Sequence, residues 1–128
     1  MGDSARKALV ADDSRAMRTI LSKTLGELGF EVFQASNGRE ALQVMERQGP
    51  AVELALVDWN MPEMTGIEFV REIRSKPDFS ALRLMMVTTE TEMEQVALAL
   101  EAGADEYVMK PFTRDTVEDK LRLLGAIS

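Results

Sequence analysis

Five short apolar runs alternate with longer amphipathic stretches along this chain, and this alternation constrains the fold more than any other feature. Three of the runs are apolar at every position, which is typical of parallel strands buried on both faces. The second and fifth runs look less buried. We therefore expect five strands, at residues 8–11, 32–35, 54–57, 84–87 and 107–109.

Apolar residues at helical spacing follow each of these runs. After the first run, Met17, Leu21 and Leu25 share one helical face. Ser14 is a candidate N-cap for this helix, and Gly29 is its expected end. Four similar helices are expected. One starts near Gly38, one contains Ile67 and ends before Pro77, one runs from about Thr91 to Gly103, and one follows Pro111.

Strands that alternate with helices through short connections predict right-handed crossovers and a parallel sheet with helices on both faces. The expected fold is a doubly wound (βα)5 α/β domain with the flavodoxin-like strand order 2-1-3-4-5. In this order the first and third strands are neighbours, at the switch point where ligands bind. A chain of 128 residues has the size of one domain, so we interpret residues 1–128 as a single domain.

Composition narrows the possible chemistry. The chain has no Cys and no His, which excludes zinc fingers, iron–sulfur clusters and catalysis by its own thiolates or imidazoles. Its 22 acidic and 15 basic residues give a formal net charge of −7, which disfavours binding to nucleic acids and to anionic membranes. No apolar run reaches the roughly 20 residues of a membrane span, and no signal peptide begins the chain. We therefore expect a cytoplasmic protein.

Carboxylates stand at the carboxyl ends of the first and third predicted strands. Asp12 and Asp13 follow the first strand, and Asp58 follows the third. Because these ends meet at one edge of a parallel sheet, the three side chains repel one another unless they share a cation. Mg²⁺ favours such oxygen ligands, although ligand type alone does not separate it from Ca²⁺.

Thr88 and Lys110 follow the fourth and fifth predicted strands, on the other side of the same crevice. Lys110 offers a compact positive charge and Thr88 offers a hydroxyl donor, so the crevice suits a dianion such as a phosphoryl group. The nucleophile suited to this arrangement is a carboxylate, which forms an aspartyl phosphate. Asp58 is the central candidate for that role.

Four segments carry a resemblance to a known family: 10–14 (Val-Ala-Asp-Asp-Ser), 57–62 (Val-Asp-Trp-Asn-Met-Pro), 87–90 (Val-Thr-Thr-Glu) and 110–112 (Lys-Pro-Phe). Together, and spaced over the whole chain, they resemble a response regulator receiver domain. Within that family the chain is most similar to stand-alone CheY-type chemotaxis regulators. The resemblance therefore implies a receiver without a separate output domain.

The resemblance implies that Asp58 accepts a phosphoryl group from the phosphohistidine of a sensor histidine kinase, with Mg²⁺ as the cofactor. Lys110 and Thr88 are expected to contact the phosphoryl oxygens, together with the backbone amides of Trp59 and Thr89. The implied metal ligands are Asp13, Asp58 and the backbone carbonyl of Asn60, with Asp12 acting through water.

The resemblance also implies a switch. On phosphorylation Thr88 moves inward and Tyr107 fills the space behind it, which reshapes the surface formed by the fourth helix, fifth strand and fifth helix. Asn60 and Glu90 are expected to tune the rate of dephosphorylation. The Lys110–Pro111 peptide bond is expected to be cis.

Such a receiver is a phosphoacceptor that signals through partners rather than an enzyme. We expect a monomer that binds the flagellar motor switch, with a phosphatase as a further partner. Acidic residues at 90, 92 and 94 open the fourth helix, where motor-binding relatives usually carry lysines, whereas Lys120 of the fifth helix is retained. The alternative is a stand-alone receiver that docks a kinase, a phosphotransfer protein or another non-motor effector, or that acts as a phosphate sink.

Two other functions use similar residues. A haloacid-dehalogenase-like phosphohydrolase has a nucleophilic Asp, but its Asp-x-Asp segment needs an acidic residue where this chain has Asn60. A flavodoxin binds the flavin phosphate with a Ser/Thr/Gly loop, where this chain has two carboxylates. Ordinary structural roles are the further alternative, with Asp12, Asp13, Thr88 and Thr89 as turn or cap residues and Trp59 and Tyr107 as partly buried aromatics.

Overall fold

The computed structural model describes residues 6–89 and 93–127. A parallel sheet of five strands lies at its centre, in the order β2-β1-β3-β4-β5 that the sequence predicts. The second and fifth strands, which the sequence indicates to be less buried, lie at the two edges of the sheet. The strands are β1 (Arg6–Ala11), β2 (Phe30–Ala35), β3 (Val52–Asp58), β4 (Arg83–Thr88) and β5 (Glu106–Met109).

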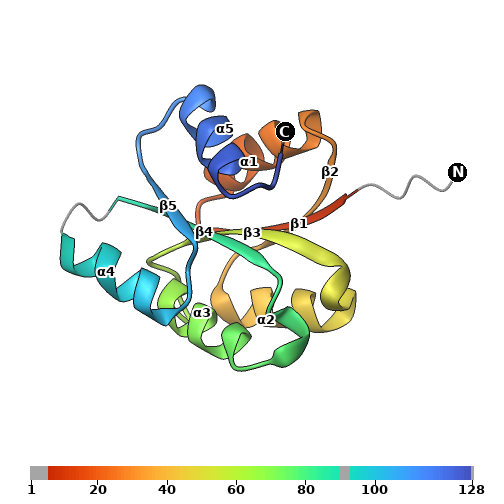
Figure 1. Cartoon of the computed structure of the whole chain (residues 1–128), viewed down its shortest axis with the longest axis vertical. Helices are drawn as coiled ribbons and strands as arrows, with labels where there is room; N and C mark the ends of the chain where they lie inside the picture. Colours follow the sequence, from red (N-terminus) through yellow and green to blue (C-terminus); the bar gives the residue numbers. More distant parts are fainter. Residues whose placement is uncertain (1–5, 90–92, 128) are drawn as a thin grey trace, which may run out of the picture.

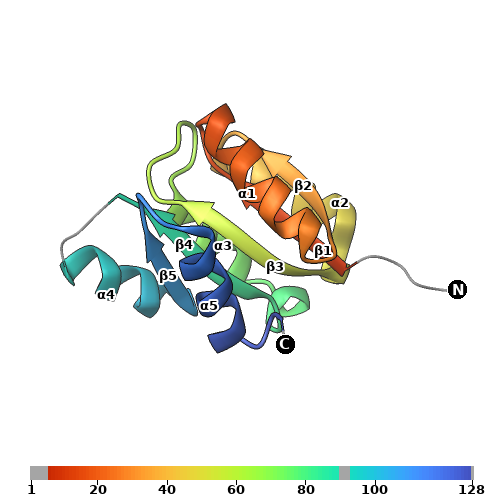
Figure 2. The same ribbon diagram turned by 90° about the horizontal axis from the view of Figure 1, so that it is seen from above.

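Helices cover both faces of this sheet (Figure 1). The first and fifth helices lie on one face, and the second, third and fourth lie on the other, as the view from above also shows (Figure 2). The order of elements confirms a flavodoxin-like (βα)5 fold. The helices are α1 (Arg15–Glu27), α2 (Gly38–Gln48), α3 (Gly66–Arg74), α4 (Met93–Ala102) and α5 (Arg114–Leu123).

Each face of the sheet has its own apolar core. The first core lies against α2, α3 and α4 and includes Val57 and Phe69. The second core lies against α1 and α5 and includes Leu56, Leu25 and Leu121. Because successive side chains of a strand point to opposite faces, the neighbours Leu56 and Val57 contribute to different cores.

Local signals in the sequence set the ends of the elements. The Ser14 hydroxyl caps α1 by accepting a hydrogen bond from the backbone N–H of Met17 at 3.2 Å. Gly29 follows this helix with a φ of 101°, a conformation that favours glycine. The third and fourth strands run one residue further than the apolar runs, so Asp58 and Thr88 are their last residues.

Two short 3₁₀ helices were not predicted from the sequence: Gly49–Ala51, which contains Pro50, and Pro77–Phe79. Proline favours the first turn of a helix because its fixed φ is already suitable there. The expected start of the fourth helix at Thr91 lies outside the described residues. Within residues 6–89 and 93–127, no helix combines the length and the apolar character needed to cross a membrane.

Candidate functional site

Four polar side chains stand where the strands end, at one edge of the sheet. Asp12 follows β1, Asp58 ends β3, Thr88 ends β4 and Lys110 follows β5. Parallel pairing of β1, β3, β4 and β5 keeps these ends level with one another. The edge is therefore polar at the switch point, where ligands bind in folds of this class.

Three carboxylates form a cluster at this edge. One carboxylate oxygen from each of Asp12, Asp13 and Asp58 lies within 4.8 Å of the other two. Asp12 and Asp58 are 1% and 7% exposed, whereas Asp13 is exposed. Two buried carboxylates at this spacing need a nearby positive charge.

Hydrogen bonds hold Asp12 on every side. Its Oδ1 accepts from the backbone N–H of Ser14 at 2.9 Å, and its Oδ2 accepts from Lys110 Nζ at 2.9 Å. Its backbone carbonyl accepts from Arg18 Nη1 at 2.7 Å, and its backbone N–H donates to the carbonyl of Ala35 at 3.0 Å. Both carboxylate oxygens of Asp12 are therefore already engaged by donors of the protein.

Asp13 differs from Asp12, because its carboxylate makes no hydrogen bond or ion pair with any described residue. It is thus the carboxylate of the cluster that is freest to bind a cation. The three acidic side chains face one lysine, which leaves an excess of negative charge made of hard oxygen donors. This donor set fits Mg²⁺, which binds one or two carboxylates and keeps several waters.

Lys110 supplies the positive charge of the site. Its Nζ lies 2.9 Å from Asp12 Oδ2 and 3.4 Å from Asp58 Oδ1, and its backbone N–H donates to the Thr88 carbonyl at 2.8 Å. The Lys110–Pro111 peptide bond is cis, the conformation that the family resemblance implies. Burial alone lowers the pKa of Lys110, but the Asp12 hydrogen bond and the two carboxylate charges hold that pKa above its usual value. The ammonium group therefore stays charged.

The pKa of Asp58 is raised from 3.8 to about 6. Burial is the largest cause, and the negative charge of Asp12 adds to it. Lys110 offsets part of this rise through its charge and its hydrogen bond. Without a metal, Asp58 is thus an anion at neutral pH that takes up a proton in mild acid.

Gly66 allows α3 to begin directly against the loop that carries Asp58. Its backbone N–H donates to the Trp59 carbonyl at 2.9 Å, and a Cβ at this position would lie 2.1 Å from the Asp58 carbonyl oxygen. Neither Gly66 nor Arg18 was predicted from the sequence. The signal for Gly66 is a glycine directly after the N-cap Thr65, where a side chain is otherwise tolerated.

The remaining predicted contact residues lie around the cluster. Thr88 is buried at the end of β4, and Thr89 beside it is exposed. In the loop after β3, Trp59 is partly buried against the first core, and Asn60 is exposed. Glu90, the second expected tuning residue, lies outside the described residues.

Tyr107 does not belong to the acidic cluster. It lies on the edge strand β5, where it pairs with Met86 of β4 and packs against the first core. Lys120 of α5 lies over its ring, with Nζ 4.8 Å from the centroid. Tyr107 therefore belongs to the surface between α4 and α5.

Comparisons with known proteins agree with this geometry. The sequence matches the family described as response regulator receiver domain over residues 8–122. It is 40% identical to chemotaxis protein CheY1 of Helicobacter pylori over 119 residues, which cover 92% of this chain and 95% of that protein. It is also 40% identical to a chemotaxis protein CheY homolog of Campylobacter jejuni over 116 residues, covering 90% and 88%.

A solved structure shows the same likeness. The high-resolution structure of chemotaxis response regulator CheY4 of Vibrio cholerae superposes with a TM-score of 0.87 at 35% sequence identity, covering 94% of this chain and 99% of that one. The acidic cluster lies where such a fold binds its ligands. The chain therefore belongs to the response regulator receiver domain family, as a CheY-like phosphoacceptor signalling protein rather than a classical enzyme.

Proposed function

We propose that this chain is the phosphoacceptor of a two-component phosphorelay, in which Asp58 receives a phosphoryl group from the phosphohistidine of a sensor kinase. One observation carries this proposal: a buried carboxylate at the end of β3 lies between an acidic pair and the ammonium group of Lys110. This arrangement places a nucleophile, an expected cation site and a fixed positive charge around one point.

The transfer itself is a simple displacement. A carboxylate oxygen of Asp58 bonds to phosphorus as the bond from phosphorus to the imidazole nitrogen breaks, and the electron pair of that bond stays on the nitrogen. Lys110 balances the charge on the phosphoryl oxygens. The Thr88 hydroxyl and the backbone N–H groups of Trp59 and Thr89 donate hydrogen bonds to the same oxygens.

The proposed cofactor is Mg²⁺, which when bound neutralises charge on the phosphoryl oxygens. Asp13, Asp58 and the backbone carbonyl of Asn60 are the proposed ligands, and Asp12 acts through water. The hydrogen bonds of the cluster support this division, because both oxygens of Asp12 are engaged and the Asp13 carboxylate is free among the described residues. The side chains of Asn60 and Glu90 are proposed to tune how fast water removes the phosphoryl group.

The proposed switch couples Thr88 to Tyr107. In the pairing of β4 with β5, Tyr107 stands opposite Met86 and Thr88 stands two positions further on, so both side chains lie on the same face of the sheet. A phosphoryl group that draws the Thr88 hydroxyl inward opens space on this face for the ring. The ring then reshapes the output surface, by which we mean the surface of α4, β5 and α5, and shifts partner binding.

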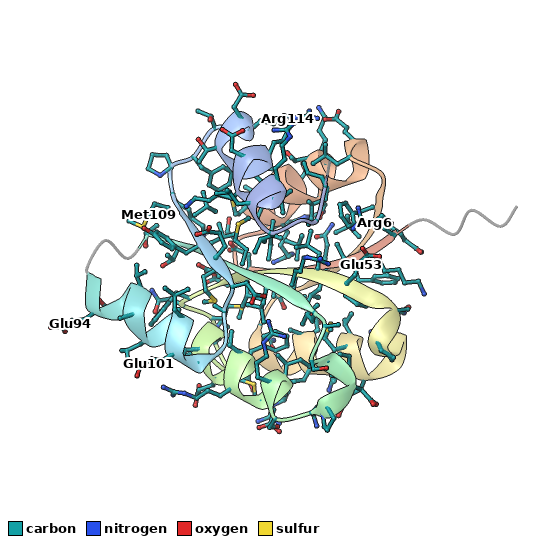
Figure 3. All side chains as sticks on the ribbon, viewed as in Figure 1. Arg6, Glu53, Glu94, Glu101, Met109 and Arg114 are labelled. Carbon is teal, nitrogen blue, oxygen red and sulfur yellow. The ribbon has the colours of Figure 1, made fainter. Side chains whose placement is uncertain are left out.

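The proposed output is chemotaxis, with residues 1–128 acting by binding a partner and the flagellar motor switch as the favoured partner. The similarity to chemotaxis proteins of Helicobacter pylori and Campylobacter jejuni supports this choice. One observation favours the alternative of a non-motor effector, a docked kinase or phosphotransfer protein, or a phosphate sink. Helix α4, as the structure describes it, carries no basic residue. Its Glu94 and Glu101 are exposed and point away from the sheet (Figure 3).

Trp59, the single Trp, provides the test of phosphoryl transfer because it follows Asp58 directly. Its fluorescence is expected to change with Mg²⁺ and to change again, in a saturable way, with acetyl phosphate. The second change and the mass gain of one phosphoryl group are expected to be absent in Asp58→Asn. No response at either step, together with no mass gain in the wild type, would remove the phosphoacceptor function.

The output is tested by binding. The phosphorylated chain is expected to bind purified flagellar motor switch protein more tightly than the unphosphorylated chain, whereas Asp58→Asn shows no such gain. Equal binding in both states, with faster loss of the phosphoryl group from the kinase, would instead favour the phosphate sink.

A further inference from the structure

Tyr107 belongs to the edge strand β5. This strand lies between α4 and α5 (Figures 1 and 2). A pocket of about 360 Å³ opens beside its side chain and is lined also by Phe112 and Lys120. The ring is contacted from α5, since Lys120 Nζ lies 4.8 Å from the ring centroid. A cation at this distance over an aromatic face is attracted by the electrons of the ring.

Glu106 holds Lys120 in this place. Its Oε1 lies 3.2 Å from Lys120 Nζ and also accepts a hydrogen bond from the backbone N–H of Tyr107 at 3.0 Å. One carboxylate oxygen thus joins the lysine to the backbone of the residue that the lysine covers. The side chains of Lys120 and Glu106 are only 27% and 21% exposed, so solvent screens this pair less than an open surface pair. We call Glu106, Tyr107 and Lys120 the edge triad.

We propose that Glu106 and Lys120 are positioning residues that hold Tyr107 over the edge of the sheet and thereby set the resting state of the output surface. The proposal rests on the proposed function for the movement of Tyr107 on phosphorylation. When the ring moves toward Thr88, it leaves Lys120 and loses the contact with the ammonium group. The edge triad therefore stabilises the resting position of Tyr107 and not its inward position. A ligand or modification must overcome this free-energy difference to shift the population toward the inward position.

Substitutions at two positions separate the parts of the edge triad. Lys120→Met keeps most of the aliphatic stem and removes the charge, and Lys120→Arg restores a cation that also binds aromatic faces. Glu106→Gln keeps a side-chain oxygen for the Tyr107 N–H and removes the charge that holds Lys120. Lys23→Met, at an exposed position of α1, controls for the loss of one positive charge.

Tyr107 is the single tyrosine of the chain, so incorporation of fluorotyrosine gives one fluorine NMR signal that reports this ring alone. In the unphosphorylated protein, Lys120→Met is expected to move this signal toward the position seen with Mg²⁺ and acetyl phosphate, and Lys120→Arg to return it. Glu106→Gln is expected to move it in the same direction and to add nothing in the Lys120→Met background. The acetyl phosphate concentration for half of the Trp59 change is expected to fall about fivefold in Lys120→Met.

Signals in Lys120→Met and Glu106→Gln that coincide with that of Lys23→Met would overturn the proposal. Additive shifts in the double variant would overturn the part in which Glu106 acts through Lys120. In a further outcome, the wild-type fluorine signal stays unchanged with acetyl phosphate while the substitutions shift it in the unphosphorylated protein. This result would support the edge triad and reject the proposed switch. The opposite pattern would keep the switch and reject the triad.

Discussion

The ammonium nitrogen of Lys110 lies 2.9 Å from Asp12 Oδ2, so at rest this lysine binds a carboxylate that is not the proposed phosphoacceptor. Its distance to Asp58 is longer, at 3.4 Å. A phosphoryl group on Asp58 gives Lys110 a more highly charged partner than either carboxylate. Asp12 therefore holds the ammonium group of Lys110 close to Asp58 before the phosphoryl group arrives.

Lys110→Met is expected to abolish the Trp59 response to acetyl phosphate without weakening Mg²⁺ binding. Loss of the ammonium group removes the proposed phosphoryl contact, but it also removes a positive charge that repels the metal. Titration of Trp59 fluorescence with Mg²⁺ measures the first binding step, and acetyl phosphate measures the second. A variant that no longer binds Mg²⁺ would contradict the role given to Lys110.

Asp58→Asn is expected to stabilise the metal-free fold at about pH 8 by on the order of 2 kcal/mol. The carboxyl titrates near 3.8 when unfolded and near 6 in the fold, so the folded form binds more protons between these values. Its contribution to stability therefore falls as pH rises from about 4 to about 6 and then stays constant. Urea unfolding in a chelator at about pH 4 and about pH 8 measures the effect. An equal difference between variant and wild type at both pH values would show that Asp58 titrates normally.

Asp13→Asn is expected to weaken Mg²⁺ binding by about 100-fold, and Asp12→Asn by only about tenfold. The Asp13 carboxylate is proposed as a direct ligand, whereas Asp12 holds Lys110 and the Ser14 amide and acts through water. Mg²⁺ titrations followed by Trp59 fluorescence give both affinities. Equal losses would overturn this ranking. The wild-type affinity is also expected to rise as pH increases through about 6, because Asp58 must lose its proton to bind metal.

Gly66→Ala is expected to lower the free energy of unfolding by about 3 kcal/mol. The added Cβ would lie 2.1 Å from the Asp58 carbonyl oxygen, so α3 or the loop must shift. Gly26→Ala, in α1, is the matched control, because a Cβ at this position would have no atom within 4 Å. This substitution is expected to raise the free energy of unfolding by about 0.5 kcal/mol. Urea unfolding compares the two variants, and similar small effects would show that the contact near Asp58 relaxes freely.

The fold could be predicted because each strand is a compact apolar run and each helix carries its own start or stop signal. Ser14 shows this for α1, where the expected N-cap makes the expected hydrogen bond. The acidic edge could be predicted for the same reason, since Asp12, Asp58 and Lys110 directly follow apolar runs. Their convergence needs only the parallel sheet.

Contacts that long side chains make with neighbouring elements could not be predicted in this way. Arg18 shares a helix with other basic residues, and nothing in the sequence says that it reaches the Asp12 carbonyl. Glu106 and Lys120 lie on different elements, and their meeting over Tyr107 depends on how α5 packs beside β5. Such contacts depend on the three-dimensional packing of the finished fold rather than on local sequence.

The central sheet separates two apolar cores, and the residues of the proposed switch lie on only one side of it. Tyr107 packs against the first core, and Thr88 shares its face, whereas Leu25 and Leu121 belong to the second core beneath α1 and α5. Substitutions in the second core are therefore expected to change the free energy of unfolding. Substitutions in the first core are expected to change, in addition, the movement of Tyr107 on phosphorylation. Stability and the response to phosphorylation can thus be adjusted separately, by selection or by design, on opposite sides of one sheet.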